Sequence, residues 1–89
     1  MKTVIFQWDE ENVEHLASHQ VMPFEAEEVL DDDPLVLKTR DNKSLAYGQT
    51  DAGRYLLVVS VWKSHHTIRV ITARDLTRAE KSRLKRRRK

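Results

Sequence analysis

Four cationic side chains lie within or beside stretches of sequence that favour β-strands: Lys43, Arg54, Arg69 and Arg74. Arg69 interrupts an otherwise apolar stretch, and a guanidinium buried there without a partner would be very costly. It therefore requires either a phosphate ligand or a carboxylate from the acidic first half of the chain, and the sequence leaves both open. Strict alternation would place Arg69 and Arg74 on opposite faces, but the strand is expected to end near Ala73. The sequence therefore does not decide whether the two arginines converge.

Two histidines, His15 and His19, are spaced so that both imidazoles lie on one face of a helix. The residues between them include no glutamate base and no third ligand accompanies them, so a position at the helix surface or end is favoured over a metal site. The chain also lacks a glycine-rich phosphate loop and a serine nucleophile elbow. We therefore expect neither a metal nor a cofactor.

The composition predicts one small domain. The 89 residues include no cysteine, which excludes a disulfide framework, a thiolate nucleophile and a cysteine-ligated metal. The longest apolar run, Tyr55–Val59, is far shorter than the ~20 residues of a membrane helix, and charge at Asp9 interrupts any signal-peptide core. We expect a single domain over residues 1–89 that is soluble, cytoplasmic and without membrane contact.

The net charge of +2 conceals a segregation of charge along the chain. Residues 1–37 hold one lysine against ten acids, whereas residues 38–89 hold fifteen Lys and Arg against four acids. The last twelve residues contain eight basic side chains, Lys81 and Arg83 among them. Such a run binds polyanions with little sequence preference. A solvated tail, or pairing between the two halves of the chain, is the alternative explanation.

The periodicity predicts an α+β fold: a small antiparallel β-meander sheet with two short N-terminal helices and a basic C-terminal helix. We expect a strand at Thr3–Trp8, then helices from Asp9 to about His19 and over Pro23–Leu30. Four β-rich runs follow, and the short turns between them favour antiparallel pairing: Leu35–Arg40, Leu45–Thr50, Tyr55–Trp62 and Thr67–Ala73. The third run is nearly all apolar and should be a central strand covered on both faces. Thr77–Glu80 matches a capping box that begins the last helix.

Cations gathered around a sheet suggest a module that binds or cleaves RNA without a metal. Attack of the ribose 2′-OH on the adjacent phosphate needs a base, cations to stabilise the phosphorane and an acid for the 5′-oxygen. Histidine, lysine and arginine side chains supply all three. Four aromatic side chains on expected strands could stack on a base, although core packing is the alternative for each: Trp8, Tyr47, Tyr55 and Trp62.

Several strings of residues resemble the BrnT family of toxin ribonucleases, in the family's order and over nearly the whole chain. They are Phe6–Asp9 with Asn12, His19–Val21 leading to Phe24–Val29, Tyr47–Arg54, and Ile68–Arg74 followed by Thr77 and Glu80. The Ile-Arg-x-Ile-Thr-Ala-Arg block is the most specific of them. The resemblance implies a compact relative of the RelE fold, which agrees with the α+β fold expected from the periodicity.

The resemblance also implies a metal-independent endoribonuclease that blocks translation. A cognate antitoxin, usually a ribbon-helix-helix DNA-binding protein, would hold it inactive in a hetero-oligomer and would cover the cationic face. Arg69 and Arg74 would stabilise the phosphorane, and Lys43 and Arg54 would grip phosphates. His19, with His15 as the alternative, would transfer the proton. Further RNA contacts would come from Lys81, Arg83 and Trp8, and we expect the strand cations to gather in one phosphate-sized pocket.

Two positions depart from the family pattern. Lys43 precedes a serine where members commonly carry an arginine followed by an aromatic, and lysine lacks the planar fork that grips a phosphate with two bonds. Gln20 stands where many members carry glycine. The alternatives are therefore a non-catalytic module of the same fold that binds nucleic acid or protein, and an interaction protein whose acidic half binds a basic partner.

Overall fold

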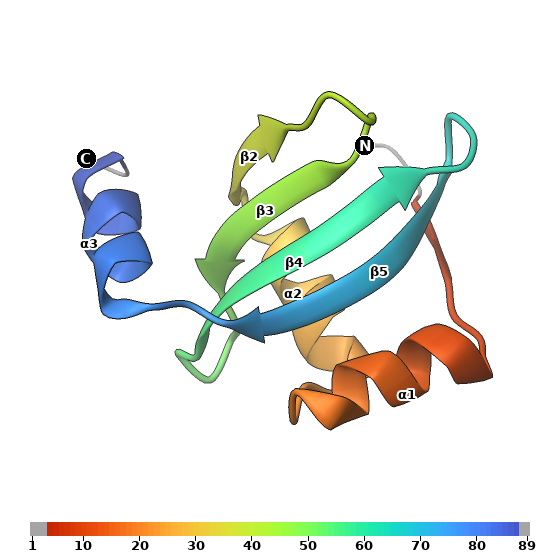
Figure 1. The fold of residues 1–89 in the computed structure, drawn as a ribbon, viewed down its shortest axis with the longest axis horizontal. Helices are drawn as coiled ribbons and strands as arrows, with labels where there is room; N and C mark the ends of the chain where they lie inside the picture. The colour runs from red at the N-terminus through yellow and green to blue at the C-terminus, as the bar shows by residue number, and fades with distance from the viewer. Residues whose placement is uncertain (1–3, 88–89) are drawn as a thin grey trace.

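The computed structural model describes residues 4–87 (Figure 1). In chain order its elements are β1 (Ile5–Gln7), α1 (Glu10–Ser18), α2 (Pro23–Asp31), β2 (Leu35–Lys38), β3 (Ser44–Gln49), β4 (Tyr55–Trp62), β5 (Thr67–Asp75) and α3 (Arg78–Arg87). The expected α+β class and the expected order of elements are confirmed. Thr3, Arg88 and Lys89, which belong to the expected first strand and the basic tail, lie outside the described residues.

The strands form one sheet in the order β1-β5-β4-β3-β2. Strands β2 to β5 make the expected antiparallel meander, and β4 lies at its centre. Leu56 and Val58 face one side of β4 and Leu57 faces the other, and all three are buried, so this strand is covered on both faces. The sequence did not place β1, which pairs in parallel with the free edge of β5. A parallel pair needs a long crossover, and the helices and the meander together supply it.

Helices α1 and α2 cover one face of the sheet (Figure 1). Asp9 caps α1 as expected, because its carboxylate accepts a hydrogen bond from the backbone N–H of Asn12. The buried Asn12 amide donates to the backbone oxygens of Gln7 and Val70, which ties α1 to β1 and β5. The main core lies between these helices and the sheet and consists of Leu16, Val21, Ala26, Val29, Ala46, Leu56, Val58, Val70 and Ala73.

Glycines fit the two places in the chain where a side chain would interfere. A Cβ at Gly48 would lie 3.1 Å from a methyl group of Val29, so the absence of a side chain lets α2 approach β3 closely. Gly53 has φ +97°, a conformation that favours glycine, in the turn before β4. Both glycines of the Tyr47–Arg54 string therefore serve the fold.

Helix α3 packs on the opposite side of the sheet, near one end. Leu84 forms a second buried cluster with Leu57 and Leu76. The expected capping box is present, because the Glu80 N–H donates to Thr77 Oγ1 and the Glu80 carboxylate accepts from the Thr77 N–H. We call this side of the sheet, opposite α1 and α2, the open face.

Gln20, just after α1, has φ +61° in the left-handed region that glycine adopts without steric cost. Gln20→Gly is therefore expected to raise the free energy of unfolding by about 0.5–1 kcal/mol. Urea denaturation measures this change. The control is Ala17→Gly within α1, which should lower the free energy of unfolding by about 1 kcal/mol. A destabilising Gln20→Gly would show that the glutamine side chain makes a compensating interaction.

Candidate functional site

A β-bulge decides on which side of the sheet the β5 arginines lie. Val59 pairs with Thr72 and Ser60 pairs with Val70, so Ile71 is the extra residue of β5. Beyond the bulge the alternation is reset: Arg69 is opposite Val61 and Arg74 is opposite Leu57. Since Val61 and Leu57 are four residues apart in β4, both arginines start from the open face, about 13 Å apart along the strand.

Arg69 lies between β5 and the start of α1. Its guanidinium donates to both carboxylate oxygens of Asp9, at 2.7 and 3.3 Å, to Glu11 at 3.1 Å and to the side-chain oxygen of Gln7 at 3.4 Å. The Arg69 hydrogen bond is the main reason why the pKa of Asp9 lies below its usual value. Of the five guanidinium donors, only Nε–H is left without a protein partner among the described residues. The Arg69 side chain is 18% exposed and that of Glu11 is 88% exposed, so an incoming phosphate can displace Glu11 at low cost.

A hollow of about 270 Å³ adjoins Arg69, and one wall of it is His15. Glu11, Asn12 and Ile71 complete the lining. His19 does not line it, but the rings of His15 and His19 lie 5.5 Å apart. This hollow brings a titratable imidazole and a fixed guanidinium to one place, which favours the alternative His15 over the first choice His19 for proton transfer.

Arg74 lies at the other end of the open face and is held by α3. It donates two bonds to the Glu80 carboxylate, at 2.9 and 3.0 Å, and one to the backbone oxygen of Asp75. This pairing with Arg74 is the main cause that lowers the pKa of Glu80 to about 2. The sequence showed Glu80 as a capping residue but gave no sign that the same carboxylate also pairs with an arginine of the preceding strand.

The low pKa of Glu80 predicts a dependence of stability on pH. Its folded pKa of about 2 lies below the ordinary value of 4.5, so its stabilising contribution is present above pH 4.5 and is lost as the pH falls toward 2. Glu80→Gln should lower the free energy of unfolding by about 1 kcal/mol at pH 7, a discounted value because Arg74 is 41% exposed to screening solvent. Urea unfolding at pH 7 and at pH 2.5 tests this. A difference between variant and wild type that is as large at pH 2.5 as at pH 7 would contradict it, because only a minor part of the Glu80 contribution remains at pH 2.5.

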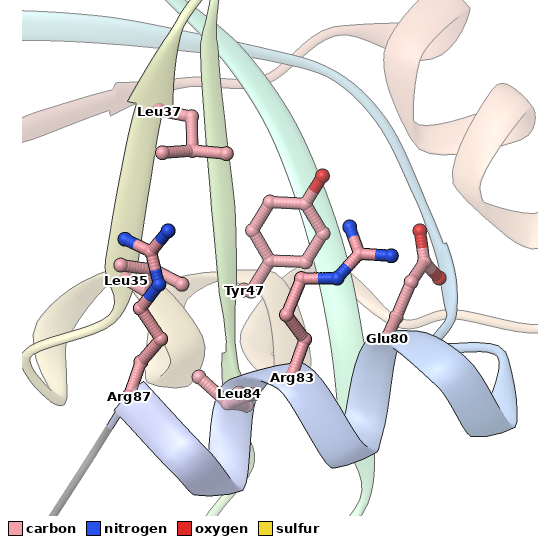
Figure 2. Close-up of a pocket in the computed structure, with 7 residues that line it drawn as sticks. All are labelled: Leu35, Leu37, Tyr47, Glu80, Arg83, Leu84 and Arg87. Carbon is pink, nitrogen blue, oxygen red and sulfur yellow. The ribbon is translucent and has the colours of Figure 1, made fainter.

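A small hollow of about 40 Å³ lies beside this pair. Figure 2 shows that Arg87 of α3 lies next to Leu35 in this hollow and that Arg83 lies next to Tyr47. Arg83 therefore adds cationic charge at the Arg74 end of the open face. Lys81 and Lys85 instead lie over the ring of Tyr55, at 5.6 and 5.5 Å from its centroid. The tyrosine ring is thus already covered by lysines.

The other candidate residues differ in how far their side chains are already engaged with protein partners. Arg54 uses four of its five donors on Asp75, Glu25 and the backbone oxygen of Gln20. It therefore links the turn before β4 to β5, to α2 and to the segment after α1, which favours a structural role over phosphate binding.

Trp8 packs against the main core and donates to Glu27 at 2.6 Å, so its ring is not free to stack on a base. Lys43 pairs with Asp41 at 3.0 Å and its side chain is 43% exposed. It directly precedes β3 at the Arg69 end of the sheet, two strands from β5, a lateral distance of about 10 Å.

The expectation of one phosphate-sized pocket is wrong. The cations divide between two ends of the open face, and each strand arginine has carboxylate partners: Arg69 has acids from the first half of the chain, and Arg74 has Glu80 from α3. Of the two possibilities that the sequence left open for Arg69, the structure therefore contains the ion pair. The structure also places His15 near Arg69, which no spacing of residues in the sequence could indicate.

Residues 4–87 show neither a metal site nor a membrane-spanning helix. They contain no group of three or more His, Cys, Asp or Glu side chains arranged to hold a metal ion. No helix within this range has the length and apolar character needed to span a membrane.

Comparisons with known proteins agree with the fold and the strings of residues described above. A family model described as "Ribonuclease toxin, BrnT, of type II toxin-antitoxin system" matches residues 8–80. The fold is similar to the crystal structure of the Brucella abortus ribonuclease toxin BrnT, with a TM-score of 0.66 and 16% sequence identity. That match covers 88% of this chain and 100% of the other. No curated protein sequence matches the chain. Since the family model spans most of its length, the chain belongs to the BrnT family of ribonuclease toxins of type II toxin–antitoxin systems.

Proposed function

We propose that this protein is a metal-independent endoribonuclease whose cleavage centre is the hollow between His15 and Arg69. The observation that carries the proposal is the presence of an imidazole and a guanidinium on one hollow of about 270 Å³. A proton acceptor beside a phosphate-binding cation is what attack by a ribose 2′-OH requires.

In the proposed reaction His15 removes the proton from the 2′-OH, whose oxygen attacks the adjacent phosphorus. Arg69 leaves Glu11 and donates to the equatorial oxygens of the phosphorane, where negative charge accumulates. The bond to the 5′-oxygen breaks, and that oxygen takes up a proton from a solvent water molecule. The proton that His15 has accepted neutralises the resulting hydroxide. The products are a 2′,3′-cyclic phosphate and a free 5′-hydroxyl.

The remaining cations of the open face would bind the neighbouring phosphates of the strand. Arg74 is about 13 Å from Arg69 along β5, too far to share one phosphate. It has two donors without a protein partner, counted over the described residues. Lys43 on one side and Arg83 on the other extend the cationic surface.

Cleavage of RNA in the cytoplasm would inhibit translation, and a cognate antitoxin would neutralise the protein in a hetero-oligomer. Family membership supports an antitoxin partner. A ribbon-helix-helix antitoxin that covers the open face would block both Arg69 and Arg74.

The test is cleavage of a synthetic single-stranded RNA by purified protein in excess EDTA. We expect fragments with 2′,3′-cyclic phosphate and 5′-hydroxyl ends, and no cleavage of a strand in which the 2′-OH groups are replaced by hydrogen. Loss of activity in EDTA that magnesium restores would overturn metal independence. Binding of RNA without any shortening of it would instead support the non-catalytic alternative.

A further inference from the structure

A second hollow, of about 330 Å³, lies on the other side of the sheet, the side that α1 and α2 cover. It lies beside the C-terminal end of α2. Its walls are mostly apolar and come from distant parts of the chain: Phe6, Leu30, Val36, Trp62 and Ile68. A volume of this size accommodates a large side chain or a small ligand.

The strand surface that lines this hollow carries two serine hydroxyls. Ser44 and Ser60 are opposite each other on β3 and β4, and both side chains line the hollow. Ser60 is fully buried, and its Oγ has no hydrogen-bond partner among the described residues. A buried hydroxyl without a partner is costly and uncommon in native proteins. Since Ser60 is 0% exposed, a donor inside the hollow reaches its Oγ only when neighbouring side chains move, and the hydrogen bond would then remove this cost.

The rim of the hollow is partly apolar and partly acidic. Val36 and Trp62 are 46% and 41% exposed and line the same hollow, so they add exposed apolar surface at its rim. Asp31 and Asp33 also line the hollow, and with Asp32 they form an exposed run of carboxylates that makes no ion pair with any described residue. The run begins at the last residue of α2, where the helix dipole adds negative potential.

We propose that this hollow is a docking site for an aromatic side chain carried on a basic segment of a partner protein. The apolar walls would hold the ring, its N–H or O–H would donate to Ser60 Oγ, and flanking Lys or Arg side chains would pair with Asp31–Asp33. The acidic rim repels RNA, so this surface does not serve the nucleic acid. It lies on the opposite side of the sheet from Arg69, and the proposal does not depend on the cleavage reaction.

Peptides that carry one tryptophan between lysines test the site on the intact protein. The probe is acetyl-Lys-Lys-Trp-Lys-Lys-amide, and the controls replace Trp by Ala or every Lys by Glu. We expect the lysine–tryptophan peptide to shift the amide NMR signals of Ser60 and Ile68, and to bind at least tenfold more tightly than either control.

The chain offers a matched pair of variants. Val36 and Leu37 are neighbours on β2 with similar exposure, 46% and 44%, but only Val36 lines this hollow, whereas Leu37 lines the one beside α3. Val36→Asp is expected to weaken peptide binding at least tenfold and Leu37→Asp less than twofold. Ser60→Ala, which keeps the apolar walls, should weaken it about threefold to tenfold. RNA cleavage by Val36→Asp and Ser60→Ala should stay at the wild-type level.

Four results would overturn the proposal. The first is equal binding of the glutamate and lysine peptides, and the second is an equal effect of Val36→Asp and Leu37→Asp. The third is free indole binding as tightly as the peptide, which would indicate a small-molecule site. The fourth is a wild-type dimer in sedimentation that Val36→Asp dissociates, which would make the surface an interface between two copies of this chain.

Discussion

Arg69→Ala is expected to lower kcat for RNA cleavage by about 100- to 1000-fold, the usual effect of removing one preorganised donor to a transition state. The fold should survive, because the partners that remain, Asp9 and Glu11, have side chains 52% and 88% exposed and regain water. Circular dichroism and urea unfolding check this. Single-turnover cleavage of a short RNA measures the chemical step.

Arg74→Ala is the matched control, because this arginine is on the same strand, the same face and in a similar ion pair. We expect it to raise KM about tenfold and to change kcat less than threefold, since a phosphate contact away from the reacting atoms contributes equally to ground and transition states. The opposite result, a loss of kcat in Arg74→Ala alone, would move the chemistry to the Glu80 end of the open face.

His15→Ala is expected to lower kcat by about 100-fold, within the range for loss of a general base. His19→Ala should have less than a tenfold effect, because His19 does not line the hollow that contains Arg69. Both side chains are exposed, His15 within α1 and His19 at the C-cap of the helix, so neither change should affect stability much. The two variants therefore differ in proximity to Arg69 and in little else.

The pH–rate profile separates a proton-transfer role from a merely structural one. If His15 is the base, the acidic limb of kcat present in wild type should disappear in His15→Ala and persist in His19→Ala. An unchanged profile in His15→Ala, or a profile altered only by His19→Ala, would restore His19 as the proton-transfer residue.

The cations lie in two groups, one at each end of the open face, and this separation also affects how an antitoxin could inhibit the protein. Both strand arginines are already neutralised by carboxylates, and the most exposed of these, Glu11, is the one that a phosphate replaces in the proposed reaction. An acidic segment of an antitoxin would compete in the same way, and its binding would weaken as salt screens the charges. A partner that docks in the hollow lined by Val36 would also make apolar contacts, and salt would weaken these contacts much less than the ion pairs.

Local sequence determined the helices, the meander and the caps of this protein. Asp9 with Asn12 and Thr77 with Glu80 are short-range signals, and the apolar run of β4 required a central position. Such features depend on propensity, periodicity and side chains only a few residues apart, so the sequence alone is sufficient to predict them.

Tertiary structure decided the features on which the proposed chemistry depends. The bulge at Ile71, which places Arg69 and Arg74 on one face, depends on the register between β4 and β5 and has no local signal. The pairing of β1 with β5, which brings Asp9 and α1 to Arg69, joins residues about sixty positions apart. Such contacts follow from the packing of the whole sheet. The sequence therefore identified the cations and histidines as candidate residues. Only the assembled fold could show that His15 lies near Arg69, whereas Arg74 pairs with Glu80.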